Sequence, residues 1–480
     1  MPQDLIQAAN DIAEGRGTAL EAFERSLEAA RSPAAEAAFT QRFEGAARQA
    51  ARRVDAQREA GRTAARLAGL AVSVKALFDV QGVVTTAASR SLADAAPARA
   101  DATVVARLRA AGAALIGHTN MTEFAFSGVG INPHHGTPAN PVTRALDSQP
   151  RIPGGSTSGG AVSVATGAAW AALGSDTGGS LRIPAALQGL VGFKCTAARV
   201  PNEGSIPLAP SLDTSGAITL SVRDAVLLHE VLAARQVTLA ARPLSAWRLA
   251  VPKDVMLDAL EPVVAQAFER SLAQLSAAGA RITEIALPPL ADAASLQRGG
   301  GLAAAESWAW HAHRMAQHEV EYDPRVALRI RRGAALGAAD VAALHRERRD
   351  WITRMEGALE GWDALLSPTV PIVAPRTKPL IASDEAFFAA NALLLRNPSL
   401  VNLLDGCALS LPCHRPGDWP VGLMVWGPAD ADDRVLSVSL AIESVLRSSQ
   451  GDHEKTTGRS RVFSPPQGAD DVFRRPGGAS

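Results

Sequence analysis

Cysteine is scarce in this chain, which has three cysteines among 480 residues. Cys195, Cys407 and Cys413 form no CxxC pair, so they fit neither a disulfide framework nor a zinc site. A sparse, odd-numbered set suits a reducing cytoplasm, where we expect the protein to reside. The N-terminus has early acidic residues and lacks the apolar segment of a secretory signal. No run of about 18 uncharged apolar residues occurs, which argues against a membrane-spanning helix.

A charge excess of either sign is also missing, because 48 basic residues balance 48 acidic ones. A net charge of zero gives no reason to expect nucleic acid or an anionic membrane as a partner. Hydrophobic residues make up 47% of the chain, which is enough to bury a large core. We therefore expect a globular chain with no nucleic-acid or membrane partner. Whether it forms a homodimer stays open.

Several familiar catalytic motifs are absent as well. The glycine-rich loops lack the lysine of a GxxxxGK nucleotide-binding loop, no serine in them fits GxSxG, and HExxH does not occur. His311 and His313 form an HxH pair, but residues two apart on a helix point to different faces. No histidine pairs with a glycine-framed serine and an acid, so a histidine-based triad is not indicated. We expect neither a metal nor a cofactor.

Hydrophobic patterning divides the chain into three parts. Residues 1–66 have the period of amphipathic helices and are expected to pack as an arm on the main domain, 67–447. The polar segment 448–480, rich in Gly, Pro and Ser, is typical of a disordered tail. In the main domain strands and helices alternate, which predicts an α/β sandwich with a largely buried sheet.

The expected elements of the main domain follow from their periods. We expect strands within 67–80, at the end of 101–120, and at 170–176, 247–254, 362–375 and 421–427. We expect helices at the start of 101–120 and at 161–169, 223–235, 259–279, 302–320, 325–355 and 432–446. Asp101 or Thr103 is the expected N-cap of the first of these helices, and Gly112 ends it.

Two Gly/Ser-rich loops stand close together in the segment 154–182, GGSTSGGAVSVATGAAWAALGSDTGGSLR. Glycines allow unusual backbone angles and expose N–H groups, as an anion or oxyanion cradle requires. Either loop alone is explained better by a tight turn. A small-residue helix and a strand separate the two loops.

Lys75 stands near the end of an expected strand in which Val72 and Val74 alternate with Ser73 and Lys75, as in a strand with one apolar face. A lysine desolvated there has a lowered pKa, and its neutral amine can act as the general base for a serine. Taken alone, Lys75 is explained more simply as an edge-strand lysine that aids solubility. Only its combination with the two serine loops favours a catalytic role.

This combination resembles the amidase signature family. Four segments carry the resemblance: VSVKALFDVQGVVTT (72–86), GAALIGHTNMTEFAFS (112–127), IPGGSTSGGAVSVATG (152–167) and ALGSDTGGSLRIPAALQGLVGFK (172–194). Weaker similarity at 362–375, 404–413 and 419–427 extends it over about 67–446. The sequence departs from the family at His118, where lysine is common, and at Cys195, where proline is common. The resemblance implies a single α/β/α sandwich with a mixed central sheet covered by helices.

The resemblance also implies a role for each matching residue. Ser180 matches the nucleophile, Ser156 the serine that follows a cis peptide bond and relays protons, and Lys75 the general base and acid. Ser158 could be mistaken for the relay, but the spacing from Ser180 favours Ser156. The family's oxyanion hole corresponds to backbone N–H groups of Thr177, Gly178, Gly179 and Ser180. Asp176 and Arg182 match polar residues that hold the loop of the nucleophile.

The implied activity is hydrolysis of a small-molecule carboxylic amide, with a small aryl or alkyl amide favoured. Expected substrate contacts come from Met121, Phe126, Gly155 and Asp176, with Phe124, Trp308, Trp310 and the loop 371–376 as further wall candidates. The similar glutaminase subunit of a tRNA-dependent amidotransferase is the main alternative. An allophanate-type hydrolase, esterase or urethanase could use the same residues. A non-catalytic binding module remains the alternative outside enzymes.

Overall fold

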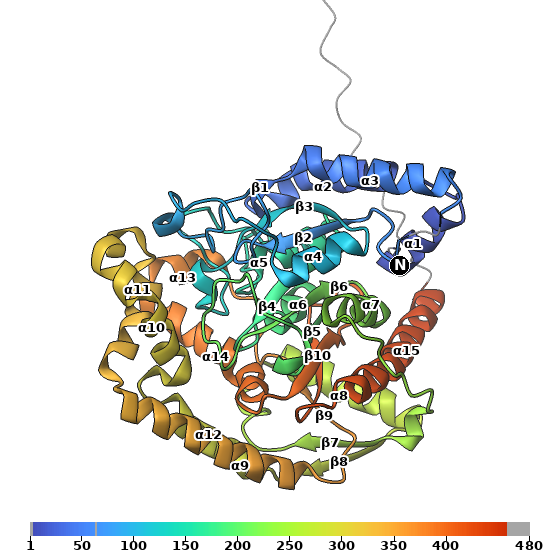
Figure 1. The fold of residues 1–480 in the computed structure, drawn as a ribbon. Coiled ribbons are helices and arrows are strands. Elements are labelled where there is room, and N and C mark those ends of the chain that lie inside the picture. The colour runs from blue at the N-terminus through green and yellow to red at the C-terminus, as the bar shows by residue number, and fades with distance from the viewer. Residues whose placement is uncertain (1–2, 63–64, 458–480) are drawn as a thin grey trace, which may run out of the picture.

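One large mixed sheet organises the computed structural model, which describes residues 3–62 and 65–457 (Figure 1). Within these residues the sheet has 11 strands in the order β1-β3-β2-β4-β6-β5-β10-β11-β9-β7-β8. β2 pairs parallel with β3 and β4, and β7 pairs parallel with β8 and β9, while the other pairs are antiparallel. The strands are β1 (Phe39–Arg42), β2 (Ala71–Lys75), β3 (Ala114–Thr119), β4 (Ala171–Asp176), β5 (Val191–Lys194), β6 (Thr214–Thr219), β7 (Arg248–Pro252), β8 (Arg281–Ile285), β9 (Ala364–Pro368), β10 (Cys407–Pro412) and β11 (Gly422–Gly427).

Helices cover this sheet. They are α1 (Leu5–Ala13), α2 (Ala19–Arg31), α3 (Glu44–Glu59), α4 (Thr103–Ala110), α5 (Ser158–Ala165), α6 (Arg182–Gln188), α7 (Val222–Ala233), α8 (Pro262–Ala277), α9 (Pro289–Asp292), α10 (Gly301–His318), α11 (Pro324–Arg331), α12 (Ala338–Leu359), α13 (Thr377–Ala382), α14 (Asp384–Leu403) and α15 (Asp432–Thr457). α5 and α6 pack together on the central strands, and α7, α8 and α15 form another packed layer on the sheet. The expected α/β sandwich with a mixed, covered sheet is confirmed.

The central strands are buried more completely than the sequence pattern indicated. All five residues of β2 are buried, so the face that carries Ser73 and Lys75 is covered as well as the apolar face of Val72 and Val74. Its polar side chains are buried because each has a partner: the Ser73 hydroxyl hydrogen-bonds that of Ser163 at 2.8 Å, and Lys75 contacts two other hydroxyls. Buried polar groups need such partners. The two polar residues of β2 therefore face a neighbouring helix and the site.

The N-terminal segment contributes a strand as well as the expected helices. β1 pairs antiparallel with β3 and forms one edge of the sheet, beside α2 and α3 at the blue end of the chain (Figure 1). Leu5, Phe23 and Val54 are buried in the same hydrophobic cluster as residues of the central strands. The N-terminal segment thus shares its core with the rest of the chain. Treating 1–66 as a separate arm stays a prediction.

Most expected elements of the main domain occur, with two local corrections. The N-cap of α4 is Ala102, without a side-chain cap, so neither Asp101 nor Thr103 caps this helix. Asp101 instead accepts hydrogen bonds from the Gln81 backbone N–H at 2.8 Å and from Arg109 at 2.7 Å. Gly112 follows the end of the helix with a φ of 87°, as expected. The stretch 325–355, expected as one helix, is divided into α11 and α12.

The C-terminal part of the chain ends, for the described residues, in α15. This helix continues through 448–457, and the remainder of the expected tail, 458–480, lies outside the described residues. Within 3–62 and 65–457, none of the helices combines the length and apolar character needed to cross a membrane.

Candidate active site

The site is built at the carboxyl ends of β2 and β4. These strands are parallel neighbours, with Val74 opposite Leu173, so their ends lie at the same edge of the sheet. Lys75 is the last residue of β2 and Asp176 the last of β4. The loop 154–157 leads into α5, and the loop 177–181 leads from β4 into α6. The strand order thus brings both Gly/Ser-rich loops next to the lysine.

Lys75 is fully buried and held by two hydroxyl groups. Its Nζ lies 2.8 Å from Ser156 Oγ and 2.8 Å from Ser175 Oγ. Burial lowers the pKa of Lys75 to about 7, against the opposing attraction of Asp176 and Asp213. The amine can therefore lose its proton near neutral pH, because water is excluded from it. Sequence reasoning missed Ser175, although the parallel pairing of β2 with β4 was the signal that could have found it.

Ser156 is the relay candidate that the structure brings to Lys75, whereas the Ser158 hydroxyl donates to Asn120 O at 3.4 Å. The peptide bond between Gly155 and Ser156 is cis, as the resemblance implies. Gly155 donates its N–H to Gly128 O at 2.8 Å, and a Cβ on it would lie 2.7 Å from Gly130 N. This position therefore needs glycine for close backbone packing. Gly155 does not line the cavity described below.

Ser180 lies at the start of the turn into α6 and lines a cavity of about 480 Å³. The Thr157 N–H donates to Ser180 O at 3.3 Å, which holds the two loops side by side. Ser156 Oγ and Ser180 Oγ, both in the described part of the chain, are not hydrogen-bonded to each other. The structure thus shows the first hydrogen bond of the expected relay, between Lys75 and Ser156. For the second, between Ser156 and Ser180, it shows only that the two loops lie side by side.

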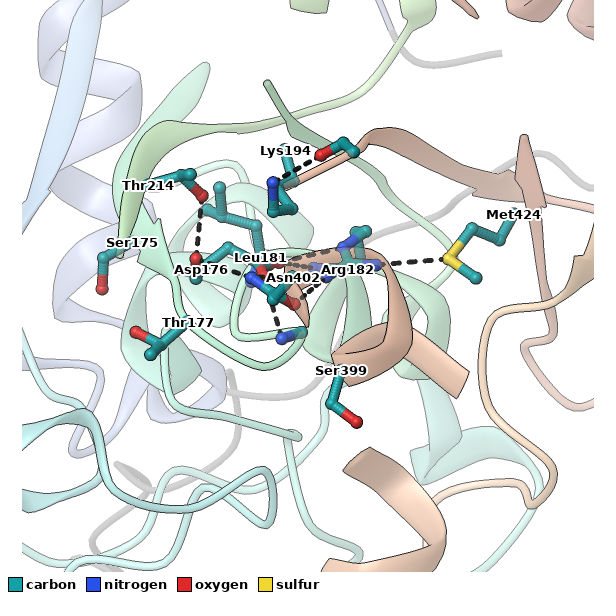
Figure 2. Close-up of polar contacts among 12 residues, drawn as sticks. Ser175, Asp176, Thr177, Leu181, Arg182, Lys194, Thr214, Ser399, Asn402 and Met424 are labelled. Carbon is teal, nitrogen blue, oxygen red and sulfur yellow. Dashed lines mark hydrogen bonds and ion pairs between the residues drawn. The ribbon is translucent and has the colours of Figure 1, made fainter. Parts of the chain in front are cut away.

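A buried ion pair fixes the backbone around Ser180. Figure 2 shows Asp176, Asn402 and Arg182 joined by hydrogen bonds: Arg182 Nη2 donates to Asp176 Oδ1 at 2.8 Å, and Asn402 Nδ2 donates to the same oxygen at 2.9 Å. Burial alone would raise the pKa of Asp176, but the charge and hydrogen bonds of Arg182 outweigh burial and hold it well below its usual value. Asp176 also accepts the backbone N–H of Gly179 at 2.8 Å and of Leu181 at 3.1 Å.

These contacts revise two expectations about the loop. The carboxylate of Asp176 already occupies the Gly179 N–H, so Gly179 does not offer a free oxyanion donor in this structure. The N–H groups of Thr177, Gly178 and Ser180 have no comparable partner among the described residues. Asp176 is completely buried and does not line the cavity, which makes it a support of the loop rather than a substrate contact.

A second acid beneath the loop was missed by sequence reasoning. Thr177 donates its hydroxyl to Asp213 Oδ1 at 2.5 Å, and Asp213 Oδ2 accepts the N–H groups of Leu208 at 3.0 Å and Ala209 at 3.1 Å. Burial raises the pKa of Asp213 to about 6 despite these hydrogen bonds. Nothing near Asp213 in the sequence indicates this role, because the contact spans 36 positions.

The cavity separates the expected wall residues into two groups. Phe126 lines it, together with Thr177, Gly178 and Ser180. Met121, Phe124, Trp308 and Trp310 do not line it, nor does the loop 371–376. Phe124 instead stacks on Tyr322 with ring centroids 5.3 Å apart. Phe124 is therefore part of the core packing, Trp308 is partly buried against the core, and Trp310 is exposed.

The remaining reactive side chains are held away from this chemistry. His311 lies with its Nδ1 3.0 Å from the Tyr322 hydroxyl, and burial lowers its pKa to about 3. Burial raises the pKa of Cys195 to about 12, so its thiol stays protonated. In the described part of the chain, no group of three or more His, Cys, Asp or Glu residues is arranged to hold a metal ion.

Comparisons with known proteins agree with this geometry. Residues 19–436 match the family described as Amidase. A 2-amino-5-chloromuconic acid deaminase of Comamonas testosteroni is 36% identical over 410 residues, covering 83% of this chain and 86% of the relative. The glutamyl-tRNA(Gln) amidotransferase A subunit of Symbiobacterium thermophilum is 35% identical over 434 residues, covering 83% of this chain and 87% of the relative.

Among solved structures, one described as an amidase superposes with a TM-score of 0.82. Its sequence is 35% identical, and the match covers 92% of this chain and 99% of that protein. The fold, the two serine loops around Lys75 and the family match over most of the chain lead to one conclusion. This chain belongs to the amidase signature family and is an amide-hydrolysing enzyme.

Proposed function

We propose that the chain hydrolyses a small-molecule amide through an acyl-enzyme on Ser180, with Ser156 and Lys75 as the proton relay. The observation that carries the proposal is the 2.8 Å contact between Lys75 Nζ and Ser156 Oγ at a fully buried site. A buried amine whose pKa is lowered to about 7 is neutral in an appreciable fraction of molecules at physiological pH. It can then accept the proton of Ser156.

In the first half of the reaction, Ser156 passes its proton to Lys75 and takes the proton of Ser180. Ser180 Oγ attacks the amide carbonyl, and the carbonyl oxygen becomes an oxyanion. Lys75 then returns the proton through Ser156 to the leaving nitrogen, so that the C–N bond breaks and an ester to Ser180 remains. Water attacks this ester by the same relay and releases the acid. The Ser156–Ser180 contact must tighten when substrate binds, as catalytic hydrogen bonds commonly do.

The turn after β4 supplies the oxyanion site in this proposal. The N–H groups of Thr177, Gly178 and Ser180 are the donors, and Gly179 contributes by allowing the turn while its own N–H binds Asp176. Backbone donors fixed before the reaction need no reorganisation when charge develops, and one such donor contributes about 10²–10³ in rate. Asp176 and Arg182 keep these donors in place.

Substitutions of the serines and the lysine test this assignment. Ser180→Ala is expected to lower kcat by about 10³-fold or more, and Ser156→Ala and Lys75→Ala by several orders of magnitude, because the three groups act as a unit. Ser158→Ala is the matched control, since it removes a hydroxyl at the start of α5, two positions after Ser156, that is hydrogen-bonded to Asn120 O and not to Lys75. Labelling by a fluorophosphonate probe, mapped by peptide mass spectrometry, should fall on Ser180. Near-normal turnover of Ser180→Ala, or labelling elsewhere, contradicts the mechanism and reopens the binding-module alternative.

Two relatives suggest second candidates for the substrate. Similarity to the amidotransferase A subunit favours a glutaminase, which glutamine hydrolysis with and without added partner subunits would test. Similarity to the deaminase favours an unsaturated amino acid of the kind in its name, which can be assayed directly by ammonia release. Ester and urethane cleavage use the same groups and belong in the same substrate panel. The cytoplasmic location remains a prediction, as does the lack of a cofactor.

A further inference from the structure

Three arginines line the same cavity as Ser180. Arg329 comes from α11, Arg332 from the 3-10 turn Arg332–Ala335 that follows it, and Arg396 from α14. Figure 1 shows α11 and α14 on the same side of the molecule. The described residues that line the cavity include no Asp or Glu. The rest of the lining is mostly apolar, so these guanidinium groups are its formal charges.

None of these three arginines has an ion-pair partner in the described part of the chain. Arg329 donates to the Phe126 backbone oxygen and packs over the Phe126 ring, 4.4 Å from its centroid. Arg396 donates its Nε to Asn397 Oδ1 at 3.1 Å, while its Nη2 is buried without any hydrogen-bond partner. A buried N–H without an acceptor is unfavourable, so a ligand is expected to supply one.

Other arginines of the same segment show that this lack of partners is local. Arg325, about one turn before Arg329 on α11, forms an ion pair with Asp384 at 2.7 Å. Arg331, next to Arg332, forms an ion pair with Glu319. Of the four arginines within 325–332, the two that do not line the cavity are thus ion-paired to carboxylates, and the two that line it are not.

The charge of the cavity lining indicates what kind of ligand these arginines bind. Burial, together with the neighbouring charge of Arg332, lowers the pKa of Arg329 to about 10, which still leaves it charged at neutral pH. Like charges facing one partly enclosed apolar space repel each other, and an anion between them offsets that cost. The planar guanidinium group binds carboxylates with two parallel hydrogen bonds. An anionic ligand with an apolar body fits this lining better than a neutral one.

We propose that the substrate carries a carboxylate in the same molecule as the scissile amide, separated from it by an apolar carbon chain, and that Arg329, Arg332 and Arg396 hold this carboxylate. The inference rests on the proposed function for the position of the scissile bond at Ser180. It also sets a limit on the substrate: a cationic group beside the carboxylate is disfavoured, because no acid among the described lining residues can neutralise it. Glutamine, with its ammonium group, is therefore a poorer substrate than its analogue without the amine.

Matched amides test this substrate class. Succinamate, glutaramate and adipamate are compared with butyramide, valeramide and caproamide, which replace the carboxylate by a methyl group, and with glutamine, which adds an ammonium group to glutaramate. At least one carboxylated amide is expected to have a kcat/KM about 10- to 100-fold above its neutral counterpart, the range that a charge-assisted hydrogen bond provides. Glutaramate is expected to be hydrolysed faster than glutamine.

Variants then connect the preference to the arginines. Arg332→Gln and Arg396→Gln are expected to lower the ratio of carboxylated to neutral kcat/KM by about tenfold or more. Arg349→Gln is the matched control, because Arg349 is exposed on α12 and its substitution removes the same charge outside the cavity. An unchanged ratio in both cavity variants, or a wild-type enzyme that cleaves neutral amides as fast as carboxylated ones, overturns the inference and leaves the proposed function intact.

A binding measurement separates the two proposals if no amide is cleaved. The proposed function would then have failed, and calorimetric titration of wild type with glutarate and adipate decides the inference. Binding that is weakened about tenfold or more in Arg396→Gln, and not in Arg349→Gln, supports a carboxylate site. No binding, or equal binding in both variants, overturns it. Thermal unfolding of each variant checks that it remains folded.

Discussion

The pH dependence of hydrolysis follows directly from the burial of Lys75. The proposed base works only as a neutral amine, and burial places its pKa at about 7 instead of the ordinary 10.5. Below that pKa the neutral fraction falls about tenfold for each pH unit, so kcat/KM should rise with a slope of one and level off above about pH 8. An unperturbed lysine would put the same rise more than three pH units higher.

The assay is kcat/KM for a neutral amide between about pH 5 and 10, with circular dichroism at each pH to confirm that the protein stays folded. A neutral substrate is used because kcat/KM then reports the ionisation of the free enzyme. A flat profile across neutral pH, or a rise centred near pH 10, would refute the view that a desolvated Lys75 is the base.

Asp213 provides the control, because its own pKa is raised to about 6 and its titration could be mistaken for that of Lys75. Asp213→Asn removes this titration and also a negative charge that stabilises the protonated amine. If Lys75 is the base, the rise persists in this variant and moves to lower pH. If the rise in kcat/KM disappears, it came from the titration of Asp213, which accepts the hydrogen bond of the Thr177 hydroxyl.

Two further substitutions test the loop that carries Ser180. Asp176→Asn leaves Arg182 as an uncompensated buried charge, so we expect a loss of about 3–5 kcal/mol in the free energy of unfolding, measured by urea titration; a loss below about 1 kcal/mol would mean that the pair does not anchor the loop. Gly179→Ala adds a Cβ that would lie 2.6 Å from Pro398 Cβ at a φ of 126°, so we expect fluorophosphonate labelling of Ser180 to be lost. The control Gly357→Ala, where nothing lies within 4 Å, should label normally.

The sequence predicted best what depends on short spacing along the chain. The alternation of strands and helices predicted the sandwich, and the two Gly/Ser loops with an upstream strand lysine carried the family resemblance that singled out Lys75, Ser156 and Ser180. These residues lie at the ends of β2 and β4 or in the loops beside them, so their positions are set by the elements next to them along the chain. Their catalytic roles stay predictions until the substitutions are made.

Contacts that join distant segments could not be predicted in this way. Asp213 reaches Thr177 only because β6 pairs antiparallel with β4. α14 was not expected at all, since Pro398 inside it is a helix-breaking signal in a sequence. This helix nevertheless supplies Asn402 to the ion pair of Asp176 and Arg396 to the cavity.

The division of the basic stretch 325–355 shows how packing decides function here. Gly333 packs against the Ala304 backbone of α10 so closely that a Cβ would collide with it, and the helix breaks into a 3-10 turn at that point. The basic character of this stretch is visible in the sequence, but which of its arginines find a carboxylate partner is not. Only after folding has paired Arg325 and Arg331 with carboxylates do Arg329 and Arg332 remain unpaired at the cavity. The choice of substrate therefore depends on which arginines the fold leaves without a partner, whereas the chemistry depends on two loops that the sequence already identifies.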